Sequence, residues 1–210
     1  MKIIELLQVK KSFGKHQVLD KISHVFGSGK CYLLVGENGS GKSTLLKGML
    51  GLISFDSGKV KIPKTAIGYV PERMVFPEFL SIDQCLSELA KIRGLEEEKA
   101  NESIRALLKV WDLSDSRDQR MGELSKGMHQ KVLIIQALLA APDLYFFDEP
   151  MSGLDEKSQR QLIDQIKTLK SQKKTVIVTT HYPKQYEHVA DIVLMMEEGR
   201  LNEKSDVLPF

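Results

Sequence analysis

The chain has 210 residues, the length of one domain or of one domain with a small added lobe. Apolar residues make up 42% of it, enough for a sizeable core, and 30 basic residues nearly balance 28 acidic ones. The resulting net charge of +2 excludes a strongly basic nucleic-acid-binding protein and an acidic disordered one, so we expect no nucleic acid among its partners.

Cysteine content and hydropathy limit the cellular setting. Cys31 and Cys85 cannot build a disulfide framework and lie in no metal-ligand cluster, which predicts a reducing compartment. The longest apolar run, from Val132 to Ala141, is interrupted by Gln136 and is much shorter than the roughly 20 residues that cross a bilayer. If the protein acts at a membrane, another polypeptide must supply the spanning part.

The N-terminal region reads as short strands that lead into a glycine-rich loop. The last of these strands runs directly into that loop, and a helix over 42–50 follows and is stopped by Gly51. Strand, glycine loop and helix in this order predict an α/β nucleotide-binding fold. The predicted strands are 3–9, 18–25 and 31–35, with turns at 13–15 and 27–29.

The middle of the chain has helical signals instead. Ser81 and Gln84 form a capping-box pattern, and the helix that they begin runs to Arg93, with Gly94 just beyond its end. A second helix is predicted over 95–111. It has apolar residues at helical spacing: Ile104, Leu107, Leu108 and Trp111. Residues 75–135 therefore read as a helical insertion, with a further helix over 128–139.

Strand patterns return in the C-terminal third. Apolar or β-branched runs are typical of parallel strands that are buried on both faces. A helix over 156–170 joins two of them, and residues 197–200 predict a hairpin turn. The predicted strands are 144–147, 175–180 and 192–196.

A phosphate-binding loop is predicted after the third strand. Residues 36–43 match the pattern G-x-x-x-x-G-K-[ST], and the strand before them and the helix after them are the context that the pattern requires. Small residues at 39–41 let backbone N–H groups point at phosphate oxygens. Lys42 is placed to reach the β- and γ-phosphates, and the Ser43 hydroxyl to hold Mg²⁺. We favour this interpretation over a chance match.

Two acidic residues end the apolar strand over 144–147. The carboxyl ends of parallel strands meet at the ligand, so Asp148 is placed to hold Mg²⁺ and Glu149 to orient the attacking water. His181 ends its own strand in the same way and is placed near the γ-phosphate. A solvated strand end, or a structural histidine, would be the better interpretation if either motif stood alone.

One further motif identifies a family. Residues 123–131, Glu-Leu-Ser-Lys-Gly-Met-His-Gln-Lys, resemble the "LSGGQ" signature of the ATP-binding-cassette (ABC) family, with Ser125 lying 23 residues before Asp148. The resemblance covers about residues 1–200. It implies an α/β P-loop ATPase fold with a mainly parallel core sheet, an N-terminal antiparallel β region and an inserted helical subdomain. The chain would be one ATP-binding domain, with a RecA-like core at about 1–74 and 136–210 and a helical subdomain at about 75–135.

The resemblance also implies ATP hydrolysis with Mg²⁺ and assigns the site residues. Glu149 and His181 are the catalytic pair. Mg²⁺ is assigned to Ser43, Glu72 and Asp148. ATP contacts are assigned to Phe13, Gly36, Glu37, Asn38, Gly39, Ser40, Gly41, Lys42, Ser43, Thr44, Ser125, Gly127 and Asp155.

Two motifs of this chain differ from the usual ABC family sequence and indicate a subfamily. Glu72 stands where the family usually has glutamine, and the signature reads Leu-Ser-Lys-Gly-Met, with Lys126 and Met128 at variant positions. Both variants are similar to those of ABC-2-type exporter ATPases.

Partners follow from the resemblance as well. Ser125 and Gly127 would contact the γ-phosphate held by a second ATPase subunit, identical or different, in a head-to-tail dimer. An integral membrane permease would dock near residues 74–89, placing the protein in the cytoplasm on the inner face of the cell membrane. The alternative is an ABC ATPase without transport, in a sensing or resistance complex or a soluble assembly.

Overall fold

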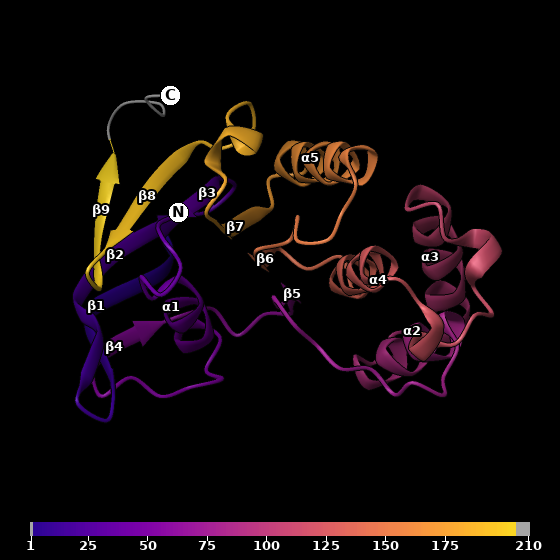
Figure 1. Cartoon of the computed structure of the whole chain (residues 1–210), viewed down its shortest axis with the longest axis horizontal. Coiled ribbons are helices and arrows are strands. Elements are labelled where there is room, and N and C mark those ends of the chain that lie inside the picture. The colour runs from indigo at the N-terminus through magenta and orange to yellow at the C-terminus, as the bar shows by residue number, and fades with distance from the viewer. Residues whose placement is uncertain (1, 205–210) are drawn as a thin grey trace.

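A six-stranded sheet forms the centre of the molecule (Figure 1). The computed structural model describes residues 2–204, and within them the strand order is β5-β6-β7-β3-β8-β9. All neighbours pair in parallel except β9, which is antiparallel to β8. The strands are β3 (Cys31–Val35), β5 (Ile67–Val70), β6 (Leu144–Asp148), β7 (Thr175–Thr180), β8 (Ile192–Glu197) and β9 (Arg200–Lys204).

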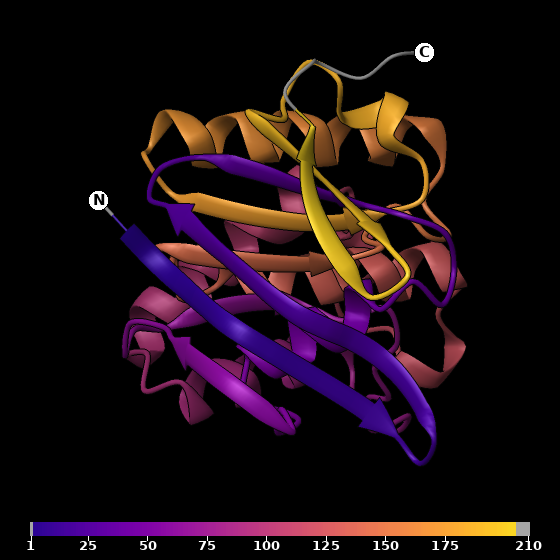
Figure 2. The same ribbon diagram turned by 90° about the vertical axis from the view of Figure 1, so that its left-hand side faces the viewer.

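A three-stranded antiparallel sheet covers one side of this central sheet (Figure 2). Its order is β2-β1-β4, with β1 at Lys2–Phe13, β2 at His16–Gly27 and β4 at Ser57–Lys61. Helix α1 (Lys42–Met49) lies on the same side, and its apolar face shares one buried cluster with both sheets.

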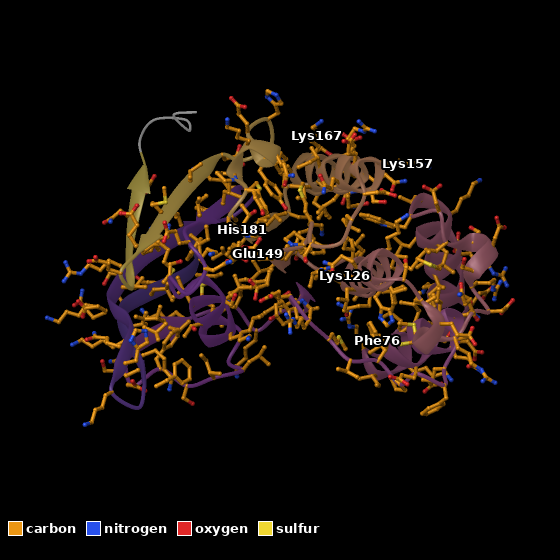
Figure 3. The ribbon with its side chains drawn as sticks, viewed as in Figure 1. Phe76, Lys126, Glu149, Lys157, Lys167 and His181 are labelled. Carbon is orange, nitrogen blue, oxygen red and sulfur yellow. The ribbon has the colours of Figure 1, made fainter. Side chains whose placement is uncertain are left out.

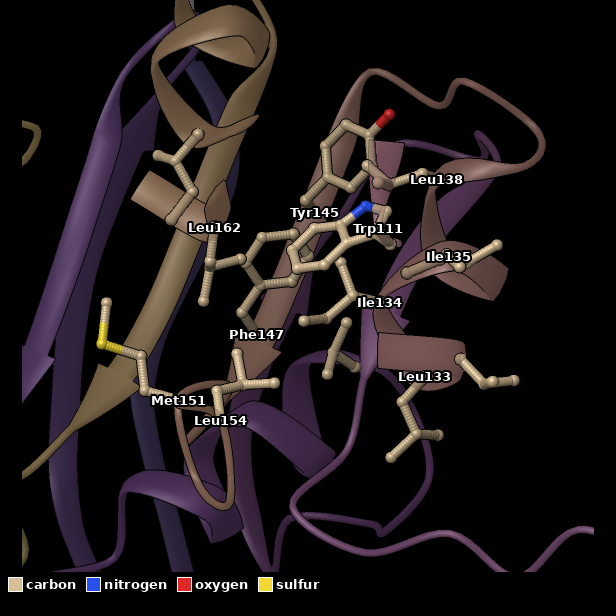
Figure 4. Close-up of a cluster of buried hydrophobic side chains, with 14 of the residues drawn as sticks. Trp111, Leu133, Ile134, Ile135, Leu138, Tyr145, Phe147, Met151, Leu154 and Leu162 are labelled. Carbon is tan, nitrogen blue, oxygen red and sulfur yellow. The ribbon is translucent and has the colours of Figure 1, made fainter. Parts of the chain in front are cut away.

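The other helices lie on the opposite face of the central sheet (Figure 1). Helices α4 and α5 lie beside the sheet, and α2 and α3 lie farther out. Figure 4 shows how side chains from this side meet, among them Trp111, Ile134 and Phe147. The helices are α2 (Ile82–Ile92), α3 (Glu97–Val110), α4 (Lys126–Leu138) and α5 (Glu156–Ser171), with short 3-10 turns at Ser114–Ser116, Met121–Glu123 and Pro183–Tyr186.

Strand β3 shows why the central strands are apolar throughout. Its side chains alternate between the two buried clusters, because successive residues of a strand point to opposite faces. Cys31, Leu33 and Val35 join the cluster on the α4–α5 side. Tyr32 and Leu34 join the cluster on the α1 side. The fold is therefore three layers, and the predicted class is confirmed.

Gln136, the polar interruption of the longest apolar run, lies inside the fold. Its amide nitrogen donates to the Tyr69 carbonyl at 2.6 Å and to the Leu133 carbonyl at 2.9 Å. Its side-chain oxygen accepts from the Arg93 guanidinium at 2.6 Å. A buried amide needs such partners. Gln136 thus joins β5, α4 and the end of α2.

Most predicted elements are present, with shifted ends. The capping box of Ser81 and Gln84 is confirmed, and Gly94 has a φ of +74° just beyond α2. Helix α3 begins two residues after its predicted start, and α4 begins at Lys126 rather than at residue 128. Strands β4 and β5 were not predicted, because β4 is mostly exposed and β5 has only four residues, too few for a clear periodicity. The predicted subdomain boundaries stay a proposal.

Candidate active site

The carboxyl ends of the parallel strands bring the predicted site residues to one edge of the sheet. In register, Val35 of β3 lies beside Thr180 of β7, and Asp148 of β6 lies beside Thr179. The phosphate loop therefore follows a strand that neighbours the one ending before His181, and Asp148 lies one strand farther along. This placement follows from strand order, which the sequence does not reveal.

The phosphate loop wraps tightly between β3 and α1. Gly39 and Gly41 have φ of +85° and +102°, conformations that side chains rarely adopt. A Cβ on Gly41 would lie 2.9 Å from Leu19 and 3.0 Å from the Val18 carbonyl, so the loop also needs a glycine there for space. The loop thus turns the N-terminus of α1 toward the site.

Lys42 points back into its own loop. Its Nζ donates to the carbonyls of Gly36 at 2.7 Å and Glu37 at 3.0 Å. Burial lowers the pKa of Lys42, and the nearby carboxylates of Glu149 and Asp148 oppose that shift. The Lys42 ammonium therefore donates to two loop carbonyls, and phosphate oxygens could accept from it in addition to these carbonyls or in their place.

Asp148 is fully buried beneath the loop. Its Oδ1 accepts from the Ser43 hydroxyl at 2.9 Å and from the Thr179 hydroxyl at 2.5 Å. Its Oδ2 is buried and has no hydrogen-bond partner in the part of the chain that the structure describes. A carboxylate oxygen left without a partner beside a serine hydroxyl fits the oxygen donors that Mg²⁺ prefers.

No cluster of three or more His, Cys, Asp or Glu among residues 2–204 has a metal-binding arrangement. Mg²⁺ does not require one, because it is usually held by one or two carboxylates together with substrate phosphates and water. Asp148 and Ser43 are therefore the side chains that could hold Mg²⁺ together with phosphate oxygens and water. Glu72 is exposed and lines the same hollow as Ser43.

Glu149 has an unusual backbone conformation. Its φ of +48° is in the left-handed region, which costs a non-glycine residue about 1–3 kcal/mol. Its N–H donates to Thr179, to the carbonyl at 3.2 Å and to the hydroxyl at 3.1 Å. These bonds to β7 hold the carboxylate over the end of the sheet.

His181 lies against that carboxylate. Its Nδ1 is 3.0 Å from Oε1 of Glu149, although the pair does not meet hydrogen-bond geometry and Oε1 has no hydrogen-bond partner within residues 2–204. Figure 3 shows both side chains at the centre of the molecule. The predicted catalytic pair is thus in contact.

A hollow of about 580 Å³ joins most of the predicted residues. Phe13 is 53% exposed at its rim, with the Lys11 ammonium 5.3 Å from the ring centroid. Gly36, Glu37 and Ser40 line an adjoining hollow that shares Asn38, Gly39 and His181 with the first. The predicted residues in the first hollow are Phe13, Asn38, Gly39, Gly41, Lys42, Ser43, Thr44, Glu72, Glu149 and His181.

The structure does not bring Ser125, Gly127 or Asp155 to that hollow. They line a separate hollow at the N-termini of α4 and α5. Ser125 caps α4 by accepting from the Met128 N–H at 3.2 Å, and Asp155 caps α5 by accepting from the Ser158 N–H at 2.8 Å. The hydrogen bonds that Asp155 accepts from Ser158 lower its pKa.

Sequence reasoning missed Thr179. Its hydroxyl connects Asp148 and the Glu149 backbone, yet a threonine in a β-branched run looks like an ordinary strand residue. Only its register opposite Asp148 identifies it.

Comparisons with known proteins agree with this geometry. Residues 19–152 match the family model described as ABC transporter. The chain is similar to a Nod factor export ATP-binding protein I of Rhizobium sp. (strain N33), 33% identical, covering 94% of this chain and 68% of that protein. It is also similar to an uncharacterized ABC transporter ATP-binding protein of Methanocaldococcus jannaschii, 34% identical, covering 94% of this chain and 75% of that protein.

A solved structure described as the ATP-binding subunit of an ABC transporter superimposes with a TM-score of 0.89 at 28% identity, covering 96% of this chain and 89% of that one. None of the helices within residues 2–204 is both long and apolar enough to cross a membrane. The chain belongs to the ABC transporter family and is an ATP-binding and ATP-hydrolysing subunit of a transporter.

Proposed function

We propose that this chain powers export through a separate membrane permease, with two ATPase subunits closing on ATP. The observation that carries the hydrolytic part is the meeting of Lys42, Asp148, Glu149 and His181 at one sheet edge. Similarity to Nod factor export ATP-binding proteins supports export as the direction.

Each residue of the site has a separate role in ATP hydrolysis. Phosphoryl transfer needs positioning and charge neutralisation more than covalent help from the protein. Lys42 neutralises the phosphates, Glu149 orients and polarises water, and His181 stabilises the transferred group. Ser43 and Asp148, with Glu72 at the rim, would hold Mg²⁺, which adds positive charge at the phosphates when it is bound.

The separate hollow at Ser125 and Gly127 supports a two-chain site. The N-terminus of α4 is suited to an anion, yet it serves no phosphate loop within its own chain. A second subunit placed head to tail brings its own ATP to this helix end. ATP then joins the two chains, and hydrolysis separates them.

An exposed apolar segment between β5 and α2 supports a permease docking site. Met74, Val75 and Phe79 are 40%, 90% and 75% exposed, whereas Phe76 between them is buried. Clustered exposed apolar side chains mark interaction surfaces more often than isolated ones do. The segment begins just after Glu72, so docking and the nucleotide hollow share one loop.

Two variants test the hydrolytic roles. Glu149→Gln is expected to bind ATP as the wild type does and to hydrolyse it at least about 100-fold more slowly, because it loses the group that polarises water. Lys42→Ala is expected to lose ATP affinity itself. Nucleotide titration and phosphate release measure the two effects separately. Hydrolysis at the wild-type rate by Glu149→Gln would show that Glu149 does not have this role.

The export proposal has its own test. The tagged chain, purified from its own cells in mild detergent, is expected to retain a multi-helix membrane protein in fixed stoichiometry. Recovery without any membrane protein would refute the permease partner and favour an ABC ATPase that does not transport.

A further inference from the structure

The aromatic side chain next to His181 lies on the imidazole ring itself. The centroids of the Tyr182 and His181 rings are 3.8 Å apart, with an angle of 47° between the ring planes. Adjacent residues of a regular strand point to opposite faces and cannot stack in this way. The contact therefore needs a chain that has left strand geometry.

The backbone after β7 supplies that geometry. Tyr182 has φ of −118° and ψ of 71°, and its N–H donates to the Thr180 hydroxyl at 3.0 Å. Pro183 follows at the first turn of a 3-10 helix, where its ring restricts the backbone of the residue before it. Tyr186 ends that short helix and is fully buried, so the far end of the turn is anchored to the core.

The stack leaves the imidazole with few free directions. The imidazole lies against the tilted Tyr182 ring, and Nδ1 is 3.0 Å from Oε1 of Glu149. The ring nitrogen left over, Nε2, is the atom available to the nucleotide hollow that His181 lines. Without the tyrosine ring, a side chain that is 35% exposed has room to rotate away from Glu149.

We propose that Tyr182 is a positioning residue for hydrolysis, which holds the His181 imidazole beside Glu149 through the contact between the two rings. The inference rests on the role proposed for His181. The tyrosine hydroxyl has no part in it, because ring contact alone restricts the imidazole. Tyr182 is 59% exposed, so its ring contributes little to the core and its removal leaves the fold intact.

The test compares the variants Tyr182→Ala and Tyr182→Phe alone and in combination with His181→Ala. Aromatic contacts of this kind shift an equilibrium by roughly two- to tenfold. Tyr182→Ala is expected to lower kcat by about three- to tenfold with an unchanged KM for ATP, and Tyr182→Phe to stay within about twofold of the wild type. In the His181→Ala background, Tyr182→Ala is expected to change nothing further, because it acts through the missing ring.

Several results overturn the inference. It fails if Tyr182→Ala keeps the wild-type kcat, if it lowers kcat equally with and without His181, or if Tyr182→Phe is as slow as Tyr182→Ala. Leu52→Ala is the matched control, since Leu52 is 60% exposed and lines no hollow of the site. Leu52→Ala is expected to have the kcat and the melting temperature of the wild type. Tyr182→Ala is also expected to have the melting temperature of the wild type.

A second readout does not depend on hydrolysis. The imidazole signals of the five histidines are observed by NMR, and the His181 signal is identified by its loss in His181→Ala. That signal is expected to carry a ring-current displacement that disappears in Tyr182→Ala and persists in Tyr182→Phe. An unchanged signal in Tyr182→Ala refutes the stack. If His181→Ala hydrolyses ATP at the wild-type rate, the role proposed for His181 is wrong, and the NMR signal still decides whether Tyr182 holds the ring.

Discussion

Replacing Thr179 by valine isolates the hydroxyl that supports the acidic pair. The Thr179 side chain is fully buried, donates to Asp148 Oδ1 at 2.5 Å and accepts from the Glu149 N–H at 3.1 Å. Valine has nearly the same shape, so the change removes hydrogen bonds without opening a cavity. The Glu149 N–H keeps the Thr179 carbonyl at 3.2 Å, whereas Asp148 keeps only the Ser43 hydroxyl.

The expected loss follows from the charge on the acceptor. A hydrogen bond to an ionised group contributes about 1.5–3 kcal/mol net, so we expect the free energy of unfolding to fall by about 2 kcal/mol. For a chain of this length that fall lowers the melting temperature by about 4–8 °C. Urea unfolding measures it as a lower midpoint with an unchanged denaturant slope.

Thr168→Val is the control for this experiment. The Thr168 hydroxyl is exposed on α5 and donates to the Asp164 carbonyl at 2.9 Å, a bond that water replaces. Its loss is expected to stay within about 0.5 kcal/mol. If Thr179→Val destabilises the protein no more than Thr168→Val does, the buried bond to Asp148 does not stabilise the fold by about 2 kcal/mol.

Two other regions give independent predictions. Ser81→Ala removes the hydroxyl that accepts from the Gln84 N–H, and it is expected to lower the free energy of unfolding by about 1 kcal/mol, measured by urea unfolding. Ser87→Ala on the same helix is the control, and equal effects of the two variants would contradict the capping role. Burial raises the pKa of Cys31 to about 12 and of Cys85 to about 11, so at about pH 8 both thiols stay protonated and covered. A disulfide-exchange reagent is expected to label neither cysteine in the folded chain and both after denaturation, and labelling of either in the folded chain would disprove this.

The sequence alone predicts much of the local structure. A serine followed three residues later by glutamine encodes the start of α2, because a capping box is satisfied within one turn. The phosphate loop is equally local, since glycines at 39 and 41 permit the positive φ that the turn needs. Continuous apolar runs likewise predict buried central strands, because both faces of those strands meet apolar layers.

Other features depend on residues far apart in the chain. Strand β4 is mostly exposed, so its sequence lacks the apolar pattern of a buried strand. It forms by pairing with β1, which lies more than 40 residues earlier in the chain. Thr179 gains its role only because β7 lies beside β6 in the register that puts it opposite Asp148. Tyr182 contacts His181 because the backbone bends after β7, which no periodicity indicates.

The chemical groups and the short turns that present them can be predicted from the amino-acid order, because motif spacing and capping act within a few residues. Which of these groups lie close together depends on the folded chain. Strand order brings Lys42, Asp148 and His181 to one edge of the sheet and leaves Ser125 at another hollow. This is so because burial between distant segments sets strand order, register and layer packing, and a local pattern does not specify which segments become neighbours.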